Sequence, residues 1–193
     1  MVDHKKKSLG IYIHIPFCVR KCYYCDFLSA PAGRETQKKY LGQLKQEILS
    51  FQGADGYEVR SVFFGGGTPS ILEAGALPQL METLRSVFPD WREEAECTVE
   101  CNPGTLTREK LIGYRESGIN RLSIGLQSAN NRELELLGRI HTWEEFLKSW
   151  ELAREAGFNN LNVDLMSGWP GQKRSCWKQT LESVLQLSPE HIS

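Results

Sequence analysis

Short apolar segments rich in β-forming residues alternate with longer amphipathic segments along this chain. The predicted strands cover residues 11–15, 59–64, 96–101, 121–126 and 161–166. Between them, apolar residues recur at helical spacing over 35–51, 77–87, a short stretch after Thr107, a stretch after Thr142, and 175–187. This alternation predicts an α/β fold of βαβ units, in which right-handed crossovers coil a parallel sheet toward a barrel or part of one.

The last residues of the chain, 189–193, have the pattern of an opening sixth strand. A natural domain rarely ends where a strand begins, because the edge of the sheet is then left exposed. The chain is therefore expected to be a fragment, truncated at about the sixth strand. Residues 1–8, with Lys5, Lys6 and Lys7, are expected to form a flexible tail, and residues 9–193 one incomplete core domain.

Composition and charge exclude several classes of function. The 23 basic and 24 acidic side chains give a net charge of −1, without the basic excess of a nucleic-acid-binding domain. No apolar run reaches the roughly 18 residues that a membrane span needs. The charged start is not followed by the apolar segment of a signal peptide, so a cytoplasmic location is expected. The six cysteines fit that compartment, because three are crowded together and three are scattered.

The strongest chemical signal is a CxxxCxxC motif, formed by Cys18, Cys22 and Cys25 directly after the first predicted strand. Parallel barrels place their active sites on such loops, at the carboxyl ends of strands. Thiolates suit both iron–sulfur clusters and zinc, but a structural zinc ion takes four ligands, and no nearby Cys or His offers an obvious fourth. Three ligands on a four-iron cluster leave one iron open to a small molecule. The motif therefore favours a [4Fe–4S] cluster over zinc or reduced structural thiols.

A glycine run follows the second predicted strand. Gly65, Gly66 and Gly67 precede Thr68 and Pro69, which places them on the same rim as the cysteines. Glycine lets the backbone approach a ligand closely and present its N–H and C=O groups. A tight turn between strand and helix gives the same pattern, so the run alone does not separate the two interpretations.

Polar residues lie near the ends of the next three strands. Because side chains alternate between the faces of a strand, Glu100, Gln127 and Asp164 share the side away from the helix layer. A buried carboxylate needs a partner, since otherwise it becomes protonated or destabilises the fold. Three such residues on consecutive strands predict a polar ligand inside the barrel mouth.

The remaining cysteines and two histidines receive no functional assignment. Cys97 and Cys101 share the helix-facing side of a strand, and together with Cys176 they are interpreted as small buried apolar residues. His14, in the first strand, is a candidate core residue. His141, in a loop, is a candidate for facing the site, but neither histidine is specific enough to be called a ligand.

The stretch IYIHIPFCVRKCYYCDF, residues 11–27, resembles the radical S-adenosylmethionine (SAM) proteins grouped with oxygen-independent coproporphyrinogen III oxidase. The resemblance continues through GGGTP, ECNP, LSIGLQ, RIH and NVDLMSGWP, and covers nearly the whole chain from Leu9 onward. It implies a partial (βα)6 barrel. It also implies a [4Fe–4S] cluster whose open iron chelates SAM, and one-electron cleavage of SAM to methionine and a 5′-deoxyadenosyl radical.

The same resemblance implies a set of ligand contacts. The three cysteines of the motif match the cluster ligands, and Gly66, Gly67 and Thr68 match a glycine strip at the methionine end of SAM. Other positions expected to contact SAM are Tyr12, Tyr24, Glu100, Gln127, Arg139 and Asp164. An electron donor is implied as a partner.

One position departs from the oxidase pattern. The oxidase branch has a fourth cysteine two residues after the third, where this chain has Phe27. Phe27 and the following Leu-Ser resemble the sister branch of HemW-type haem chaperones, which deliver haem to acceptor proteins. A haem chaperone that binds a cluster, SAM and haem is therefore favoured, and its haem-binding region is expected to lie largely beyond Ser193. The alternatives are a coproporphyrinogen III oxidase and, from another class, a zinc-stabilised interaction module.

Overall fold

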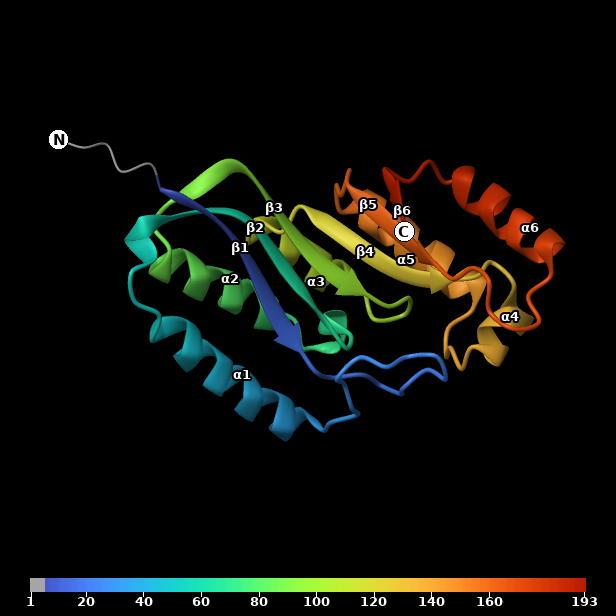
Figure 1. Ribbon diagram of the computed structural model, residues 1–193, viewed down its shortest axis with the longest axis horizontal. Coiled ribbons are helices and arrows are strands. Elements are labelled where there is room, and N and C mark those ends of the chain that lie inside the picture. Colours follow the sequence, from blue (N-terminus) through green and yellow to red (C-terminus); the bar gives the residue numbers. More distant parts are fainter. Residues whose placement is uncertain (1–5) are drawn as a thin grey trace.

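The computed structural model describes residues 6–193 and has a parallel α/β fold (Figure 1). Its six-stranded sheet follows chain order: β1 (Lys7–Ile15), β2 (Tyr57–Gly66), β3 (Trp91–Cys101), β4 (Arg121–Gln127), β5 (Leu161–Leu165) and β6 (His191–Ile192). The α-helices are α1 (Arg34–Leu49), α2 (Ala76–Val87), α3 (Arg108–Glu116), α4 (Asn131–Leu136), α5 (Trp143–Glu155) and α6 (Arg174–Leu185). Neighbouring strands are all parallel, so their carboxyl ends meet at one edge of the sheet.

This architecture confirms the predicted α/β class, and β6 is the expected sixth strand. Two boundaries differ from the predictions. The tail was expected to reach residue 8, but β1 begins at Lys7; residues 1–5 lie outside the described residues. Strand β3 begins at Trp91, before the predicted residue 96, because the chain pairs early with β2 through Val59 and then shifts register.

The sequence pattern did not predict helix α4. It has only six residues, and its buried face is Glu133 and Leu134, too few for a helical period. Its start is nevertheless encoded, because the Asn130 side chain accepts hydrogen bonds from the backbone of Arg132 and Glu133. Helix α5, which was predicted, begins with a full capping box between Thr142 and Glu145.

The hydrophobic core lies between the sheet and the helices that run along it. Alternate residues of each strand point into this layer; in β4 these are Leu122, Ile124 and Leu126, all fully buried. The helices contribute residues at helical spacing, including Leu77, Leu80, Met81, Leu84, Leu111, Phe146, Trp150 and Ala153. The opposite face of the sheet therefore remains for polar residues. In the described part of the chain, no helix has the length and apolar character needed to cross a membrane.

Two of the three scattered cysteines belong to this core, as predicted. Cys97 and Cys101 are buried on the helix-facing side of β3, and burial raises the pKa of both thiols, that of Cys97 to about 11. Cys176 differs from the prediction, because it is only half-buried. It lies in the first turn of α6, a helix that buries only Thr180 and Val184.

Candidate cofactor site

The cysteine motif lies on a loop that is closed at its base. Phe17, at the end of β1, is buried and forms an isolated parallel bridge with Ala30. The amide of Cys18 donates to the carbonyl of Ala30 at 3.2 Å, and the amide of Ala30 donates to the carbonyl of Pro16 at 2.9 Å. These contacts fix both ends of the segment that carries the cysteines. It therefore projects from the carboxyl end of β1, as the sequence predicts.

The far end of the cysteine loop rests on the turn between α4 and α5, a contact that Figure 1 shows at the tip of the blue loop. The amide of Tyr23 donates to the carbonyl of Leu137 at 3.2 Å, and the Arg20 guanidinium donates to the carbonyl of Gly138 at 2.8 Å. Gly138 has a φ of 74°, and a Cβ there would lie 3.0 Å from the Tyr23 ring. Glycine is needed at this position both for backbone conformation and for space.

The glycine run supports the base of the same loop. The amide of Gly67 donates to the carbonyl of Ile15 at 2.8 Å, and that of Thr68 donates to the carbonyl of Phe17 at 2.7 Å. A Cβ on Gly67 would lie 2.5 Å from the carbonyl oxygen of Phe17. The close backbone approach predicted for this run is therefore present, and the partner at Gly67 is the cysteine loop itself.

One cavity of about 300 Å³ brings most of the candidate residues together. Its lining includes the three motif cysteines, Tyr24, Phe27, Gly66, Gly67, Thr68, Glu100, Gln127, Arg139 and Asp164. The convergence of Glu100, Gln127 and Asp164 with the glycine run is thus present, as their strand positions predict. Their roles as ligand contacts stay predictions.

Gln127 reaches the cavity through an irregularity in the sheet. The pairing of β4 with β5 skips a residue between Gly125 and Gln127. Gln127 itself has a φ of 75°, in the left-handed region that residues with a side chain seldom adopt. Such a register shift re-aims a side chain, and backbone strain of this kind is concentrated at functional sites.

Hydrogen bonds from neighbouring groups hold the two carboxylates of the cavity. The Asp164 carboxylate accepts hydrogen bonds from the Ser123 hydroxyl at 3.0 Å and from the side-chain amide of Asn162 at 2.7 Å. Glu100 accepts one from the backbone amide of Gly66 at 3.0 Å. Burial raises the pKa of Glu100, the Gly66 amide opposes that rise, and the nearby Asp164 carboxylate adds to it. Glu100 is therefore suited to facing a positively charged group.

Arg139 joins the cysteine loop to the strand ends. Its Nη1 atom donates to Cys22 Sγ at 3.7 Å and to the Tyr24 hydroxyl at 3.5 Å. Its Nη2 atom donates to Asn102 Oδ1 at 2.7 Å and to the carbonyl of Gly125. Its Nε atom is buried without a hydrogen-bond partner. A buried charged donor without an acceptor is costly, so the site fits an additional anionic group beside Arg139.

The structure places two other candidates away from the cavity lining. The Tyr12 side chain is 57% exposed, stacks on Phe63 and meets His14 Nδ1 through its hydroxyl at 3.3 Å. His14 in turn contacts the carbonyl of Leu28 at 3.0 Å, so it supports the cysteine loop more than the core. His141, a candidate for facing the site, is buried against the carbonyl of Leu126. Burial lowers its pKa to about 3, and it is therefore neutral at pH 7.

The sequence interpretation gave no place in the site to six residues that line the cavity: Arg20, Lys21, Cys101, Asn102, Ser123 and Gly125. Asn102 lies just past the end of β3, and Ser123 shares the inward face of β4 with Gln127. The strand-end position could have identified both. Lys21, inside the cysteine motif, had no sequence signal that separated it from a solvated lysine.

Comparison with known proteins assigns the family. The chain matches the Radical SAM superfamily over residues 12–184. The chain belongs to the radical SAM superfamily. That range contains the cysteine loop and every strand end that lines the cavity.

Several radical SAM relatives are similar over nearly all of the chain. Heme chaperone HemW of Escherichia coli (strain K12) is 39% identical over 191 residues, which is 98% of this chain and 50% of that protein. Heme chaperone HemW of Bacillus subtilis (strain 168) is 39% identical over 183 residues, or 94% of this chain and 48% of that protein. The chain thus spans about half the length of these curated relatives.

A solved radical SAM structure has the same fold. Coproporphyrinogen III oxidase (HemN) from Escherichia coli superposes with a TM-score of 0.86 and 32% sequence identity, covering 97% of this chain and 44% of that one. The superposition confirms the predicted radical SAM fold for a chain that spans only part of the barrel protein.

The residues of the cavity fit the cofactors of a radical SAM protein. Among residues 6–193, no three His, Cys, Asp or Glu side chains surround a single point as ligands of one metal ion do. A zinc ion holds its sulfur ligands at about 2.3 Å from one point, whereas a four-iron cluster binds each cysteine at a different iron. Arg20, Lys21 and Arg139 bring positive charge to the cavity lining, while Glu100 and Asp164 bring carboxylates. This charge distribution suits SAM, which carries a carboxylate, an ammonium and a sulfonium group.

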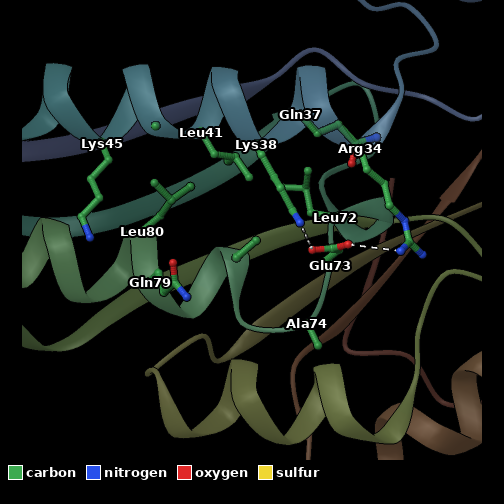
Figure 2. A pocket seen from close by; sticks show the side chains of 12 residues that line it. Arg34, Gln37, Lys38, Leu41, Lys45, Leu72, Glu73, Ala74, Gln79 and Leu80 are labelled. Atoms are coloured by element: carbon green, nitrogen blue, oxygen red, sulfur yellow. Dashed lines mark ion pairs between the residues drawn. The ribbon is translucent and has the colours of Figure 1, made fainter.

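A second cavity lies apart from the cysteines, between α1 and the start of α2 (Figure 2). Its volume is about 330 Å³. Glu73 forms ion pairs there with Arg34 at 3.4 Å and Lys38 at 3.6 Å. All three side chains are well exposed, so these pairs add little to stability. The cavity contains no residue of the candidate cofactor site.

Proposed function

We propose that this chain is the radical SAM core of a HemW-type haem chaperone, expected over residues 9–193 and extended to Lys7 by the start of β1. Cys18, Cys22 and Cys25 bind a [4Fe–4S] cluster, and the adjoining cavity binds SAM. The observation that supports this most is the convergence of the three cysteines, the glycine run and the polar strand ends on one cavity of about 300 Å³. In the full-length protein, the function is delivery of haem to an acceptor protein in the cytoplasm.

Each end of SAM has a matching group in the cavity. Arg139, with its unpartnered Nε, is suited to the carboxylate, and the Glu100 and Asp164 carboxylates are suited to the positively charged groups. Gly66, Gly67 and Thr68 line the cavity for the methionine end, and Gln127 and Tyr24 are further contacts there. The contact proposed for Tyr12 would come from outside the cavity lining. When bound, the cluster and SAM supply one-electron chemistry, for which an external electron donor is needed. The chain itself binds, orients and shields them from water.

Phe27 distinguishes this chain from the oxidase branch. It lines the cavity beside the cysteines while its side chain stays 66% exposed. A phenyl ring cannot ligate metal or exchange a proton, but it can pack on a flat apolar macrocycle. The position of Phe27 beside the cysteines supports a role in contacting haem. It does not support a role in the decarboxylation that the oxidase branch carries out. Relatives named heme chaperone HemW, at 39% identity, point to the same branch.

Replacement of Asp164 by alanine is expected to weaken SAM binding tenfold or more and leave iron content unchanged. The variant removes a ligand contact but no iron ligand, and a hydrogen bond to a charged group contributes about 1.5–3 kcal/mol. Titration calorimetry on the anaerobically reconstituted chain measures the affinity. The matched control is Asp90→Ala, which removes an exposed carboxylate paired with Lys6. Unchanged SAM affinity in Asp164→Ala would exclude Asp164 from the site.

The chaperone function is tested by haem transfer from the full-length protein. We expect a saturable change in haem absorbance on titration, followed by transfer of that haem to an apoprotein acceptor. Equilibration of the loaded protein with the acceptor, followed by separation and absorbance spectra of both, measures the transfer. A haem titration that stays linear, without saturation, would contradict the chaperone assignment.

A further inference from the structure

A directed chain of hydrogen bonds connects Arg139 with a cysteine sulfur. The Arg139 guanidinium donates to Asn102 Oδ1 at 2.7 Å, and Asn102 Nδ2 donates to the Thr68 hydroxyl at 2.8 Å. The Thr68 hydroxyl then donates to Cys18 Sγ at 3.7 Å. A second branch runs directly from Arg139 Nη1 to Cys22 Sγ at 3.7 Å. One cation thus reaches two of the three motif cysteines.

The direction of this network is fixed by the chemistry of its members. A guanidinium can only donate, so the side-chain oxygen of Asn102 must face Arg139 and its NH₂ group must face Thr68. Thr68 receives that hydrogen bond on its oxygen, which leaves its single O–H proton for Cys18. Thr68 is 2% exposed, so water does not compete for the hydroxyl. Successive donors that point the same way polarise one another.

The members of the network come from distant parts of the chain. Thr68 follows β2, Asn102 follows β3, and Arg139 lies in the turn before α5. Only the parallel sheet, which aligns the carboxyl ends of its strands, brings them to the cysteine loop. A rigid scaffold of this kind holds the donors in place while charge changes on the sulfurs.

We propose that Thr68 and Asn102, together with Arg139, are positioning residues that raise the reduction potential of the cluster. This inference rests on the proposed binding of a cluster by the three cysteines. Reduction adds negative charge that is shared with the cysteine sulfurs, and hydrogen bonds to those sulfurs stabilise the more electron-rich form. Loss of the Thr68 hydroxyl removes one such bond and disconnects Cys18 from the Arg139 charge. The reduced cluster then becomes harder to form.

The test is the midpoint potential of the anaerobically reconstituted chain, measured by a titration with dithionite and followed by electron paramagnetic resonance. Dithionite supplies the single electron that converts the oxidised cluster to the reduced one. Thr68→Val, which keeps the shape but loses the hydroxyl, is expected to disfavour reduction by up to tenfold, or about 59 mV for a one-electron couple. Thr68→Ser should keep the wild-type potential. The matched control is Thr83→Val, which removes a buried hydroxyl of α2 that donates to the carbonyl of Gln79.

Iron and sulfide per chain are measured first, which separates the inference from the function on which it rests. A wild-type chain that takes up no cluster contradicts the proposed cofactor. The inference is wrong if the wild type and Thr68→Val both hold a cluster and have equal midpoint potentials. It is also wrong if the midpoint potential of Thr68→Ser is lowered as much as that of Thr68→Val. If Thr68→Val loses its cluster, the Asn102→Leu variant is measured in its place. Asn102→Leu keeps the Thr68 hydroxyl and removes only the hydrogen-bonded link between Thr68 and Arg139. A wild-type potential in Asn102→Leu overturns the inference; a lowered one supports it.

Discussion

Simultaneous replacement of Cys18, Cys22 and Cys25 by alanine is expected to abolish iron and sulfide binding by the reconstituted chain. The three cysteines lie on one loop, and all three line the cavity. Removal of every proposed ligand leaves no site for the cluster, so the loss should be nearly complete. Iron and sulfide assays after anaerobic reconstitution measure it, together with the disappearance of the broad visible absorbance of the cluster.

The scattered cysteines provide matched controls for this experiment. Cys97→Ala removes a buried thiol from the helix-facing side of β3, and Cys176→Ala removes a half-buried one from α6. Both variants should keep the iron content of the wild type, although the cavity at position 97 should lower the free energy of unfolding by about 1 kcal/mol. Full iron in the triple variant, or a large loss in either control, would overturn the assignment of ligands.

The full-length protein is expected to bind haem and yet to form no protoporphyrinogen IX from coproporphyrinogen III. In the oxidase branch that the chain resembles, a cysteine stands at the position of Phe27. The Phe27 side chain has no proton to exchange and no lone pair to ligate a metal, so it cannot replace that cysteine. The assay is anaerobic, contains SAM and a reductant, and follows the porphyrin products by chromatography.

This assay needs a positive control, because a missing electron donor also gives no product. A coproporphyrinogen III oxidase of the HemN type should form product in the same mixture with the same reductant. Stoichiometric or greater conversion by the full-length protein would place it in the oxidase branch and exclude the chaperone proposal. Absence of product, combined with saturable haem binding, supports the proposal.

The sequence alone determined the fold class, the cysteine motif and the inward direction of most strand-end residues. The alternation of short apolar and longer amphipathic segments is a local property, and it already requires a parallel sheet. Period-two alternation within a single strand placed Glu100 on the cavity side and Cys97 on the helix side, and both are found there. These features depend only on residues close in the chain, so the pattern of the sequence was enough to predict them.

Only the tertiary structure decided which distant residues meet. Arg139 donates a hydrogen bond to Cys22, which is 117 positions away in the sequence. The carbonyl of Gly138 accepts a hydrogen bond from Arg20, which is 118 positions away. No local pattern encodes such pairs, because they arise where the carboxyl ends of separate strands align. For the same reason Asn102 was missed as a link between Arg139 and Thr68, and His141 lies against Leu126 instead of facing the site. The sequence pattern therefore identified most of the residues that can bind a cofactor. The hydrogen bonds that hold these residues in place depend on the tertiary structure, which brings distant parts of the chain together.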